Sequence, residues 1–375
     1  MKALKRANQL KSWAIEVGFD RAGIALVQPS RTGAEFLEWL ARGDQAEMAY
    51  LERRQEVRLD PREVLADASS VLCVALQYHP LVGSEAPGGD LWPRVARYAR
   101  GLDYHLIMER RLRRLAERIH ESYPGTESRI YVDTGPVLER EMAASAGLGT
   151  VGKNTNLLDP ESGSWFLLGE LFMSLEVSPD IPGSDLCGTC TECLDACPTG
   201  ALAEPYRLDS RRCISYWTIE HRGAVPPEVR PLIGDWVFGC DICQEVCPIN
   251  TDAQPGDHPE LQLPDERELL DLTGLLGLNR EQYVEAFRGS PMKRSKLEGL
   301  QRNAAVAMGN RGSQRYAPAL ITALDNEDPV VRQHVAWSLG RIGSAEGRSA
   351  LQQALVTETH PEVLNEIRSA LEGTD

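Results

Sequence analysis

The sequence predicts an α+β multidomain protein in three parts: an α/β domain over residues 1–180, a cysteine-rich module over 181–255 and an all-α domain over 256–375. Three observations predict this organisation. Apolar runs and amphipathic stretches mix near the N-terminus, eight of nine cysteines lie between Cys187 and Cys247, and a helical motif recurs after 31 residues. A chain of 375 residues is also too long for one ordinary core.

The first part mixes predicted helices and strands. Ala3–Val17 and Tyr104–His120 carry apolar residues at helical spacing. Ser70–Gln77 is an apolar run of strand length, and Arg129–Val132 is a second strand candidate. We therefore expect a mixed α/β domain.

The last part contains an internal repeat. Asn303–Arg311 (NAAVAMGNR) aligns with His334–Ile342 (HVAWSLGRI), and a third, weaker copy begins near Glu366. A second helix is expected after each of the first two copies, at Tyr316–Leu324 and Ala345–Leu355. Helix pairs of this length match short HEAT-like repeats, which bury a shared core by stacking on one another.

The charge of the chain limits its partners. The formal net charge is −15, which argues against non-specific nucleic-acid binding by the protein as a whole. Basic side chains nevertheless gather locally, at Lys293, Arg294, Lys296 and Arg302. A local basic face can hold a phosphate backbone even on an acidic protein.

We expect a cytoplasmic protein without a membrane partner. The N-terminus lacks the apolar core of a signal peptide. The longest stretch without Asp, Glu, Lys or Arg is Ala68–Ser84, and it contains Gln77, His79 and Pro80, so a membrane helix is not expected there.

The cysteines form two motifs. The first, Cys187-GT-Cys190-TE-Cys193-LDA-Cys197-Pro198, is the C-x2-C-x2-C-x3-C-P run of bacterial ferredoxins, whose fourth cysteine binds the other cluster of a pair. The second, Cys240-DI-Cys243-QEV-Cys247-Pro248, lacks one upstream cysteine, which Cys213 can supply. The pattern predicts a ferredoxin-like module with two [4Fe–4S] clusters. Cluster one takes Cys187, Cys190, Cys193 and Cys247, and cluster two takes Cys197, Cys213, Cys240 and Cys243.

Two other uses of these cysteines are possible. Zinc sites prefer two separated pairs of ligands, which a triple run followed by Cys-Pro does not provide. Disulfides are not expected in a reducing cytosol. The ninth cysteine, Cys73, stands inside an apolar run and is expected to be a small buried hydrophobic residue.

Five further motifs, in order along the chain, resemble the epoxyqueuosine reductase family. They are Tyr98–His105 (YARGLDYH), Val132–Glu141 (VDTGPVLERE), Ala146–Asn154 (AGLGTVGKN), Gly163–Phe172 (GSWFLLGELF) and Phe238–Asn250 (FGCDICQEVCPIN). One departure is Thr150, where the family usually has an aromatic residue.

The resemblance implies an enzyme that reduces epoxyqueuosine, at the wobble position of tRNA, to queuosine in the last step of queuosine biosynthesis. It implies that electrons pass from two [4Fe–4S] clusters to base-off cobalamin held by the N-terminal domain, and that the repeats bind the anticodon stem-loop. The expected electron donor is an external flavodoxin or ferredoxin system. We expect a monomer.

Site residues follow from the resemblance. Asp133 falls at the family's proton-donor position, although an aspartate before Thr-Gly-Pro is also a common turn or cap residue. The expected cobalamin contacts are Arg58, Arg97, Asp133, Leu157, Leu168, Leu171, Ser215, Cys240 and Asp241. The expected tRNA contacts are Arg222, Lys293, Arg294, Lys296, Arg302 and Asn303; a solvated helix face would also explain several of these.

Other motif residues have competing interpretations. Glu139 and Arg140 are expected to be an ordinary surface pair on a helix. The glycine turn at Gly147, Gly149 and Gly152 could bind phosphate, but by resemblance we expect its backbone to approach the corrin. Tyr216-Trp217 beside His221-Arg222 suits either an unstacked base or a core that shields a cluster.

Two other functions compete with this one. A corrinoid reductive dehalogenase usually carries an export signal and lacks such a repeat tail. A plain iron–sulfur electron carrier with an RNA-binding tail would need neither the long N-terminal domain nor Asp133.

Overall fold

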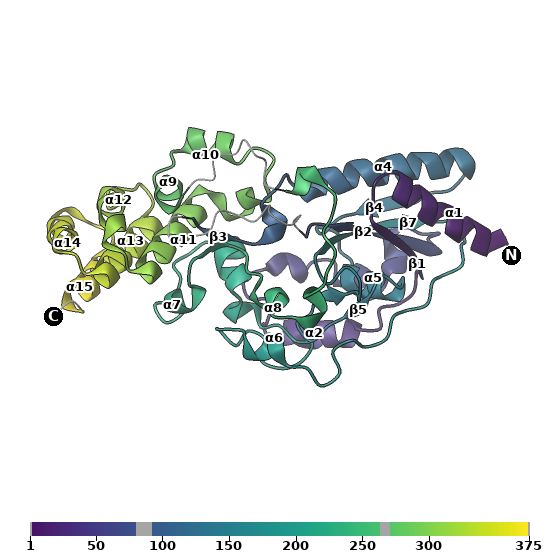
Figure 1. Ribbon diagram of the computed structural model, residues 1–375, viewed down its shortest axis with the longest axis horizontal. Coiled ribbons are helices and arrows are strands. Elements are labelled where there is room, and N and C mark those ends of the chain that lie inside the picture. Colours follow the sequence, from purple (N-terminus) through teal and green to yellow (C-terminus); the bar gives the residue numbers. More distant parts are fainter. Residues whose placement is uncertain (1, 80–91, 263–270, 374–375) are drawn as a thin grey trace. The chain divides into compact units, whose positions relative to one another are not determined.

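The structure of the chain is a computed structural model, and it describes residues 2–79, 92–262 and 271–373 (Figure 1). Contacts divide the chain into two compact units, each assembled from three stretches. The first unit comprises Met1–Ser84, Gly101–Arg211 and Asp241–Gln262, and the second comprises Glu85–Arg100, Arg212–Cys240 and Leu263–Asp375. The predicted division at residues 180 and 255 stays a prediction.

A four-stranded antiparallel sheet with the order β1-β2-β7-β4 forms the centre of the first unit. The strands are β1 (Arg21–Leu26), β2 (Ser70–Gln77), β4 (Ser128–Tyr131) and β7 (Phe166–Met173). All eight residues of β2 are buried because helices cover both faces of the sheet, which explains why this strand is a continuous apolar run in the sequence.

Helices α1 (Lys2–Glu16) and α4 (Tyr104–Ser122) pack on one face of this sheet, and α5 (Glu139–Ser145) packs on the other (Figure 1). The predicted helices and strands of this region, α1 among them, are confirmed to within two residues at each end. The remaining elements of the unit are α2 (Gly33–Ala41), α3 (Gln55–Leu59), β5 (Thr150–Val151), β6 (Leu157–Leu158), α6 (Glu192–Asp195) and α8 (Ile242–Glu245).

Paired helices dominate the second unit. The repeat helices α11 (Lys296–Arg311), α13 (Pro329–Ile342) and α15 (Pro361–Glu372) pack in sequence, with α12 (Ala317–Ala323) and α14 (Ala345–Thr357) between them. The predicted repeat is therefore confirmed in the helices. The other elements are β3 (Arg94–Val95), α7 (Arg230–Ile233), β8 (Trp236–Phe238), α9 (Leu272–Leu276) and α10 (Arg280–Ala286).

Two glycines explain how the repeat packs. A Cβ at Gly309 would lie 2.7 Å from the Trp337 ring, and a Cβ at Gly340 would lie 2.7 Å from the Cβ of Ala370. These glycines occupy the same position in successive copies, so each marks the point where one helix crosses the next at close range. The small residue is needed for contact between backbones rather than for flexibility.

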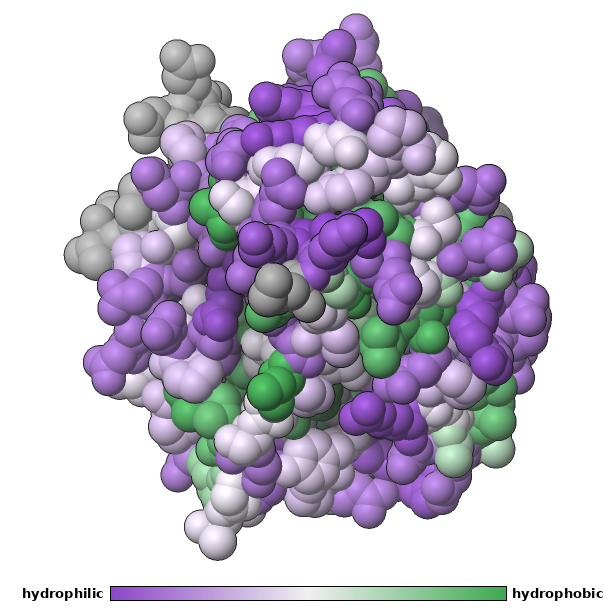
Figure 2. All heavy atoms as spheres, turned by 90° about the vertical axis from the view of Figure 1, so that its right-hand side faces the viewer, coloured by the Kyte–Doolittle hydropathy of each residue, from purple (hydrophilic) through white to green (hydrophobic). Residues whose placement is uncertain are grey.

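The face shown in Figure 2 is mostly hydrophilic, with hydrophobic residues in small groups between the polar ones. Scattered apolar residues of this kind are normal on a surface in contact with water. In the described ranges, no helix is both long enough and apolar enough to cross a membrane.

Candidate functional site

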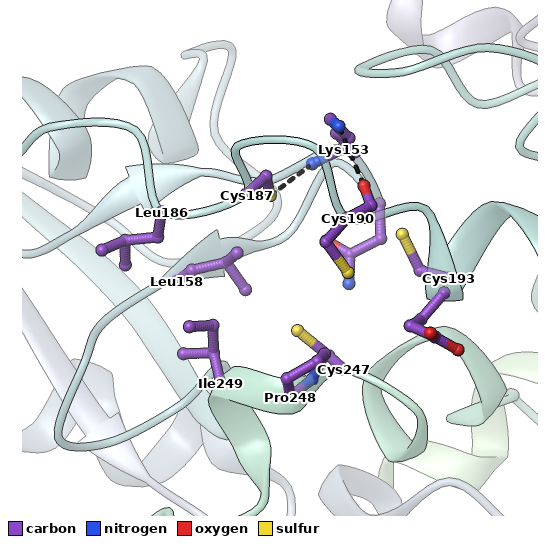
Figure 3. A pocket seen from close by; sticks show the side chains of 11 residues that line it. Lys153, Leu158, Leu186, Cys187, Cys190, Cys193, Cys247, Pro248 and Ile249 are labelled. Carbon is purple, nitrogen blue, oxygen red and sulfur yellow. Dashed lines mark hydrogen bonds between the residues drawn. The ribbon is translucent and has the colours of Figure 1, made fainter.

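The four cysteines predicted to bind cluster one line a single cavity in the first unit (Figure 3). Its volume is about 70 Å³, several times the roughly 10–15 Å³ that one water needs. Cys187, Cys190 and Cys193 reach it from the loop around α6, and Cys247 reaches it from the segment after α8. Leu158, Leu186, Pro248 and Ile249 make the rest of the wall largely apolar.

Backbone and side-chain hydrogen bonds hold this cysteine loop in place. The backbone N–H of Lys153 donates to the Cys187 sulfur at 3.4 Å, and the Lys153 ammonium donates to the carbonyls of Gly188 at 2.7 Å and Cys190 at 2.8 Å. The Asp185 carboxylate accepts from the N–H groups of Cys187 and Gly188. A donor aimed at a ligating sulfur is the kind of contact that tunes a cluster potential.

The cavity brings together four cysteine side chains, the ligand set of a [4Fe–4S] cluster. None of the nine cysteines, all of which lie in the described ranges, forms a disulfide. Over the described ranges, no three His, Cys, Asp or Glu side chains converge closely enough to hold a single ion. Burial, and then the neighbouring Cys247 and Cys187, raise the pKa of Cys193 to about 11. Four thiolates this close therefore need cationic charge between them, which iron supplies.

The second predicted cysteine set draws on both units and stays a prediction. Cys197 and Cys243 belong to the first unit, and Cys213 and Cys240 belong to the second. In the first unit, the Asn156 amide lies 3.9 Å from the Cys243 sulfur, within hydrogen-bonding range for sulfur. The ninth cysteine, Cys73, is confirmed as a buried residue of β2 with no exposed surface.

Asp133 lies at the end of a short polar chain that includes Asp103 and His105. His105 Nε2 is 3.2 Å from the Asp133 carboxylate, and His105 Nδ1 is 2.7 Å from Asp103, the residue that caps α4. Although burial disfavours the charged imidazolium, these two hydrogen bonds raise the pKa of His105 to about 9. A protonated imidazole is therefore held against Asp133 at neutral pH.

The Asp133 side chain is 53% exposed, so it is open to a ligand on its outer side. Its backbone has a φ of 56°, in the left-handed region that aspartate adopts more readily than most residues. On the inner side, the Glu139 carboxylate accepts a hydrogen bond from the Asp133 N–H. Asp133 is therefore fixed by its backbone while its carboxyl stays accessible.

Glu139 is not the plain surface residue that the sequence suggested. It begins α5 and is partly buried, whereas its neighbour Arg140 is exposed and donates to the Thr155 carbonyl. Burial and the Asp133 carboxylate raise the pKa of Glu139 to about 7.

Sequence reasoning missed a second acid, Glu170. This residue of β7 is fully buried, and neither carboxyl oxygen has a hydrogen-bond partner among the described residues. Its cross-strand neighbours are Cys73 on β2 and Tyr131 on β4. Burial, followed by the charges of Glu139 and Asp133, raises its pKa well above the ordinary value. The available signal was a lone glutamate inside the apolar strand FLLGELFM.

The expected cobalamin contacts are only partly brought together. Leu157 and Leu168 share one apolar cluster with Val57, the neighbour of Arg58. Leu171 points to the opposite face of β7, because side chains alternate along a strand. Arg58 is buried with an Nη bonded to the Arg53 carbonyl. Of the others, Asp133 and Asp241 belong to the first unit, and Arg97, Ser215 and Cys240 belong to the second.

The glycine turn packs closely within the chain, and the expected approach of its backbone to a corrin stays a prediction. A Cβ at Gly149 would lie 2.3 Å from the Leu158 carbonyl, and one at Gly152 would lie 2.5 Å from the Leu158 side chain. The turn therefore needs glycine because strand β5 closes tightly onto strand β6.

Two of the expected tRNA contacts lie inside the second unit. Arg302 is 1% exposed and donates to the backbone carbonyls of Trp217, His221 and Gly223. Asn303 is 2% exposed and accepts from the Arg302 guanidinium. These residues hold the 217–223 segment, so their burial favours an indirect role in binding.

The other expected tRNA contacts are more accessible. Arg222 and Lys296 are exposed, and Lys293 is partly exposed. Arg294 is exposed but forms a two-point ion pair with Glu220, at 3.0 Å for both contacts. Trp217 and Tyr216 are buried beside His221, so their rings belong to the core of this unit in the structure.

Three family models match separate parts of the chain. The model described as 4Fe-4S double cluster binding domain matches residues 186–250, and the model described as Epoxyqueuosine reductase QueG, DUF1730 matches residues 58–134. The model described as HEAT repeats matches residues 292–372.

Similar proteins cover most of the chain. Epoxyqueuosine reductases of Xanthomonas campestris pv. campestris and Pseudomonas aeruginosa are each 40% identical, over 90% of this chain and over 96% and 94% of the relatives. A crystal structure of epoxyqueuosine reductase with an epoxyqueuosine-modified tRNA-Tyr stem loop matches with a TM-score of 0.92 and 31% identity, over 99% of both chains. The Bacillus subtilis enzyme, with its catalytic aspartate loop swung out of the active site, matches with a TM-score of 0.91 and 30% identity over the same shares.

Proposed function

The chain belongs to the epoxyqueuosine reductase family, and we propose that it reduces the epoxide of epoxyqueuosine in tRNA to the cyclopentene of queuosine. The observation that carries this proposal is coverage: 99% of the chain aligns with a solved reductase that holds an epoxyqueuosine-modified stem loop. An electron carrier with an RNA-binding tail would have no use for the Asp133 site.

Electrons would enter through two [4Fe–4S] clusters in the matched double-cluster domain. We assign Cys187, Cys190, Cys193 and Cys247 to cluster one, because these side chains line one cavity. Cluster two would take the remaining four cysteines of the motifs. The reductant would be a one-electron donor of the flavodoxin or ferredoxin type.

Cobalamin is the second proposed cofactor, and bound cobalamin would supply the reducing centre that opens the epoxide. Leu157 and Leu168 offer apolar contacts on the α5 side of the sheet. The accessible Asp133 carboxyl lies near Glu139, the first residue of that helix. This combination fits an apolar ring with reacting atoms near an acid. Leu171 faces the other side of the sheet and would act only by supporting the strand.

Asp133 would donate a proton to the departing oxygen. This proton would be shared with His105 Nε2, which lies 3.2 Å from the Asp133 carboxylate, while Asp103 holds the other ring nitrogen at 2.7 Å. This arrangement orients the imidazole and keeps a proton beside the accessible carboxyl. The left-handed backbone and the Glu139 hydrogen bond fix the position from which Asp133 acts.

The repeat unit would bind the anticodon stem-loop through accessible basic side chains. Arg222, Lys293 and Lys296 can contact phosphate oxygens, and Arg294 can do so if it leaves Glu220. Arg302 and Asn303 would act indirectly, because their hydrogen bonds hold the 217–223 segment that carries Arg222. The modified base would have to leave the stack to reach a buried pocket.

Anaerobic reconstitution with iron, sulfide and cobalamin, followed by turnover of epoxyqueuosine-containing tRNA, tests the proposal. We expect queuosine to form with the wild-type protein. Asp133→Asn should retain tRNA binding and cluster absorbance while its turnover falls by about 10²-fold or more. Failure of the loaded wild-type protein to form queuosine would overturn the function, and full activity of Asp133→Asn would remove its assignment as the acid.

A further inference from the structure

Reduction of an epoxide to an alkene, the proposed function on which this inference rests, consumes two electrons and two protons. Both carbon–oxygen bonds break, and both protons leave on the oxygen as water. Asp133 carries one proton at a time, so its carboxyl has to be reloaded within a single turnover. A substrate base over the exposed side of Asp133 would restrict reloading from solvent on that side.

Glu139 is less exposed than Asp133, because it is partly buried at the start of α5. Its carboxylate bonds to the Asp133 N–H, and its charge interacts directly with that of Asp133. Glu139 begins α5, and residues of this helix share an apolar cluster with Leu168 and Phe172 of β7. Because side chains alternate along a strand, Glu170, between these two, lies on the same side of the sheet. Three carboxyl groups thus run from the surface to the centre of the sheet.

Few positive charges offset these acids. Among the described residues, the titratable and charged groups that act most strongly on Glu139 or the interior acid are Asp133 from its loop, His105 from α4, Arg140 from α5, Glu170 from β7 and Cys73 from β2. Tyr131 on β4 pairs with Glu170 across the sheet. Arg21 on β1 pairs with Asp159 instead, and β5 and β6 carry no titratable side chain.

This surrounding explains why the interior acids hold protons. The pKa of Glu139, raised to about 7, allows it to give and retake a proton at neutral pH. Glu170 has a still stronger tendency to remain neutral, since it is fully buried and its carboxyl oxygens lack partners among the described residues. The interior neighbour of Glu139 is therefore a neutral carboxylic acid, and not a cation that would lower the pKa of Glu139.

We propose that Glu139 supplies the second proton of the reaction by reloading Asp133. The first proton is the one shared by His105 and Asp133, and it passes to the epoxide oxygen when the first carbon–oxygen bond breaks. Glu139 then protonates Asp133, which protonates the oxygen again as water leaves. The clusters supply two electrons from the external one-electron donor, and His105 and Glu139 recover their protons from solvent after product release.

Glu139→Gln separates proton supply from structure, because the amide oxygen can still accept the Asp133 N–H. The matched control is Glu141→Gln, on the same helix, whose carboxylate bonds Ser30 and Thr32 rather than Asp133. Both variants would be assayed as reconstituted full-length proteins on epoxyqueuosine-modified stem loop, from about pH 5.5 to 8.5 with reductant in excess.

In the wild-type protein, we expect kcat to fall as pH rises through about 7, because the protonated form of Glu139 is required. Glu139→Gln should lose this pH dependence and show a kcat about 10-fold lower or more at pH 7, with unchanged KM and cluster absorbance. Imidazolium buffer should restore part of its rate in proportion to concentration. Glu139→Asp should keep the pH dependence, as should Glu141→Gln.

An unchanged kcat and pH profile in Glu139→Gln would overturn the inference while leaving the proposed function intact. If Glu139→Gln is slower but still shows the pH dependence and is not rescued by imidazolium, the role of Glu139 is structural, and the inference is overturned as well. If the loaded wild-type protein forms no queuosine at any pH, the proposed function itself fails. Should Glu139→Gln not fold, Glu139→Asp takes its place. A kcat that still falls as pH rises through about 7 would count for proton supply, and a kcat that does not depend on pH would count against it.

Discussion

Arg302→Ala should destabilise the second unit rather than weaken a contact with RNA. Arg302 is buried and remains charged at neutral pH, since burial lowers its pKa only to about 10. Its guanidinium donates to three backbone carbonyls between Trp217 and Gly223 at 2.6–2.9 Å. Alanine would remove every one of these donors and leave a cavity.

The expected cost follows from the acceptors left behind. A buried acceptor without a donor costs about 1–3 kcal/mol, and breaking a buried charged network costs about 3–5 kcal/mol. Water can reach part of the site at His221 and Gly223, where the contacts are only partly buried. We therefore expect a loss of about 3–5 kcal/mol in unfolding free energy for Arg302→Ala.

Urea unfolding followed by tryptophan fluorescence measures this effect, with stem-loop affinity measured in parallel. Arg294→Ala is the control, because its ion pair with Glu220 is exposed and should contribute less than about 1 kcal/mol. If Arg302→Ala unfolds within about 0.5 kcal/mol of wild type and yet binds RNA weakly, Arg302 faces the RNA and the structural account is wrong.

Three further predictions use the same structure. Cys193→Ala should lower bound iron from about eight to about four atoms per chain, measured after anaerobic reconstitution, whereas an unchanged iron content would remove this cysteine from cluster one. Because the pKa of His105 is raised from 6.5 to about 9 on folding, its stabilisation is complete below pH 6.5 and lost as pH rises through about 9. His105→Gln should therefore flatten the fall in unfolding free energy between these pH values, and an equally steep fall would contradict the ion pair with Asp133. Lys296→Ala should reduce the slope of log affinity against log salt by about one for the stem loop, and an unchanged slope would exclude a phosphate contact.

Much of the fold could be predicted because its pattern is local. Ser70–Gln77 is confirmed residue for residue as β2, since a strand buried on both faces needs an unbroken apolar run. The repeat was visible because close helix crossings require a small residue at the same position, Gly309 and Gly340. The four cysteines that line one cavity could be grouped from their spacing because metal ligands are restricted to a few residue types.

The acid site could not be predicted in the same way because it depends on contacts between distant segments. Glu139 was interpreted as a surface residue, because a helical pattern does not show that the carboxylate of the first residue of the helix accepts a hydrogen bond from the Asp133 N–H. Arg302 was expected to contact phosphate, and that stays a prediction; its burial within residues 300–309 of α11 was not expected. A helix surrounded by others has no polar face, and the run AAVAMG beside Arg302 was the signal for this.

The path of the chain between the two units has a consequence for anyone who wishes to study them apart. Each unit gathers three stretches that are separated in sequence by stretches of the other. No single break in the polypeptide can release one unit intact and free of the other. Truncation from the N-terminus removes part of the first unit, and removal of Leu263–Asp375 leaves the first unit joined to two stretches of the second. A fragment that holds one unit alone would require the chain to be rejoined in a new order.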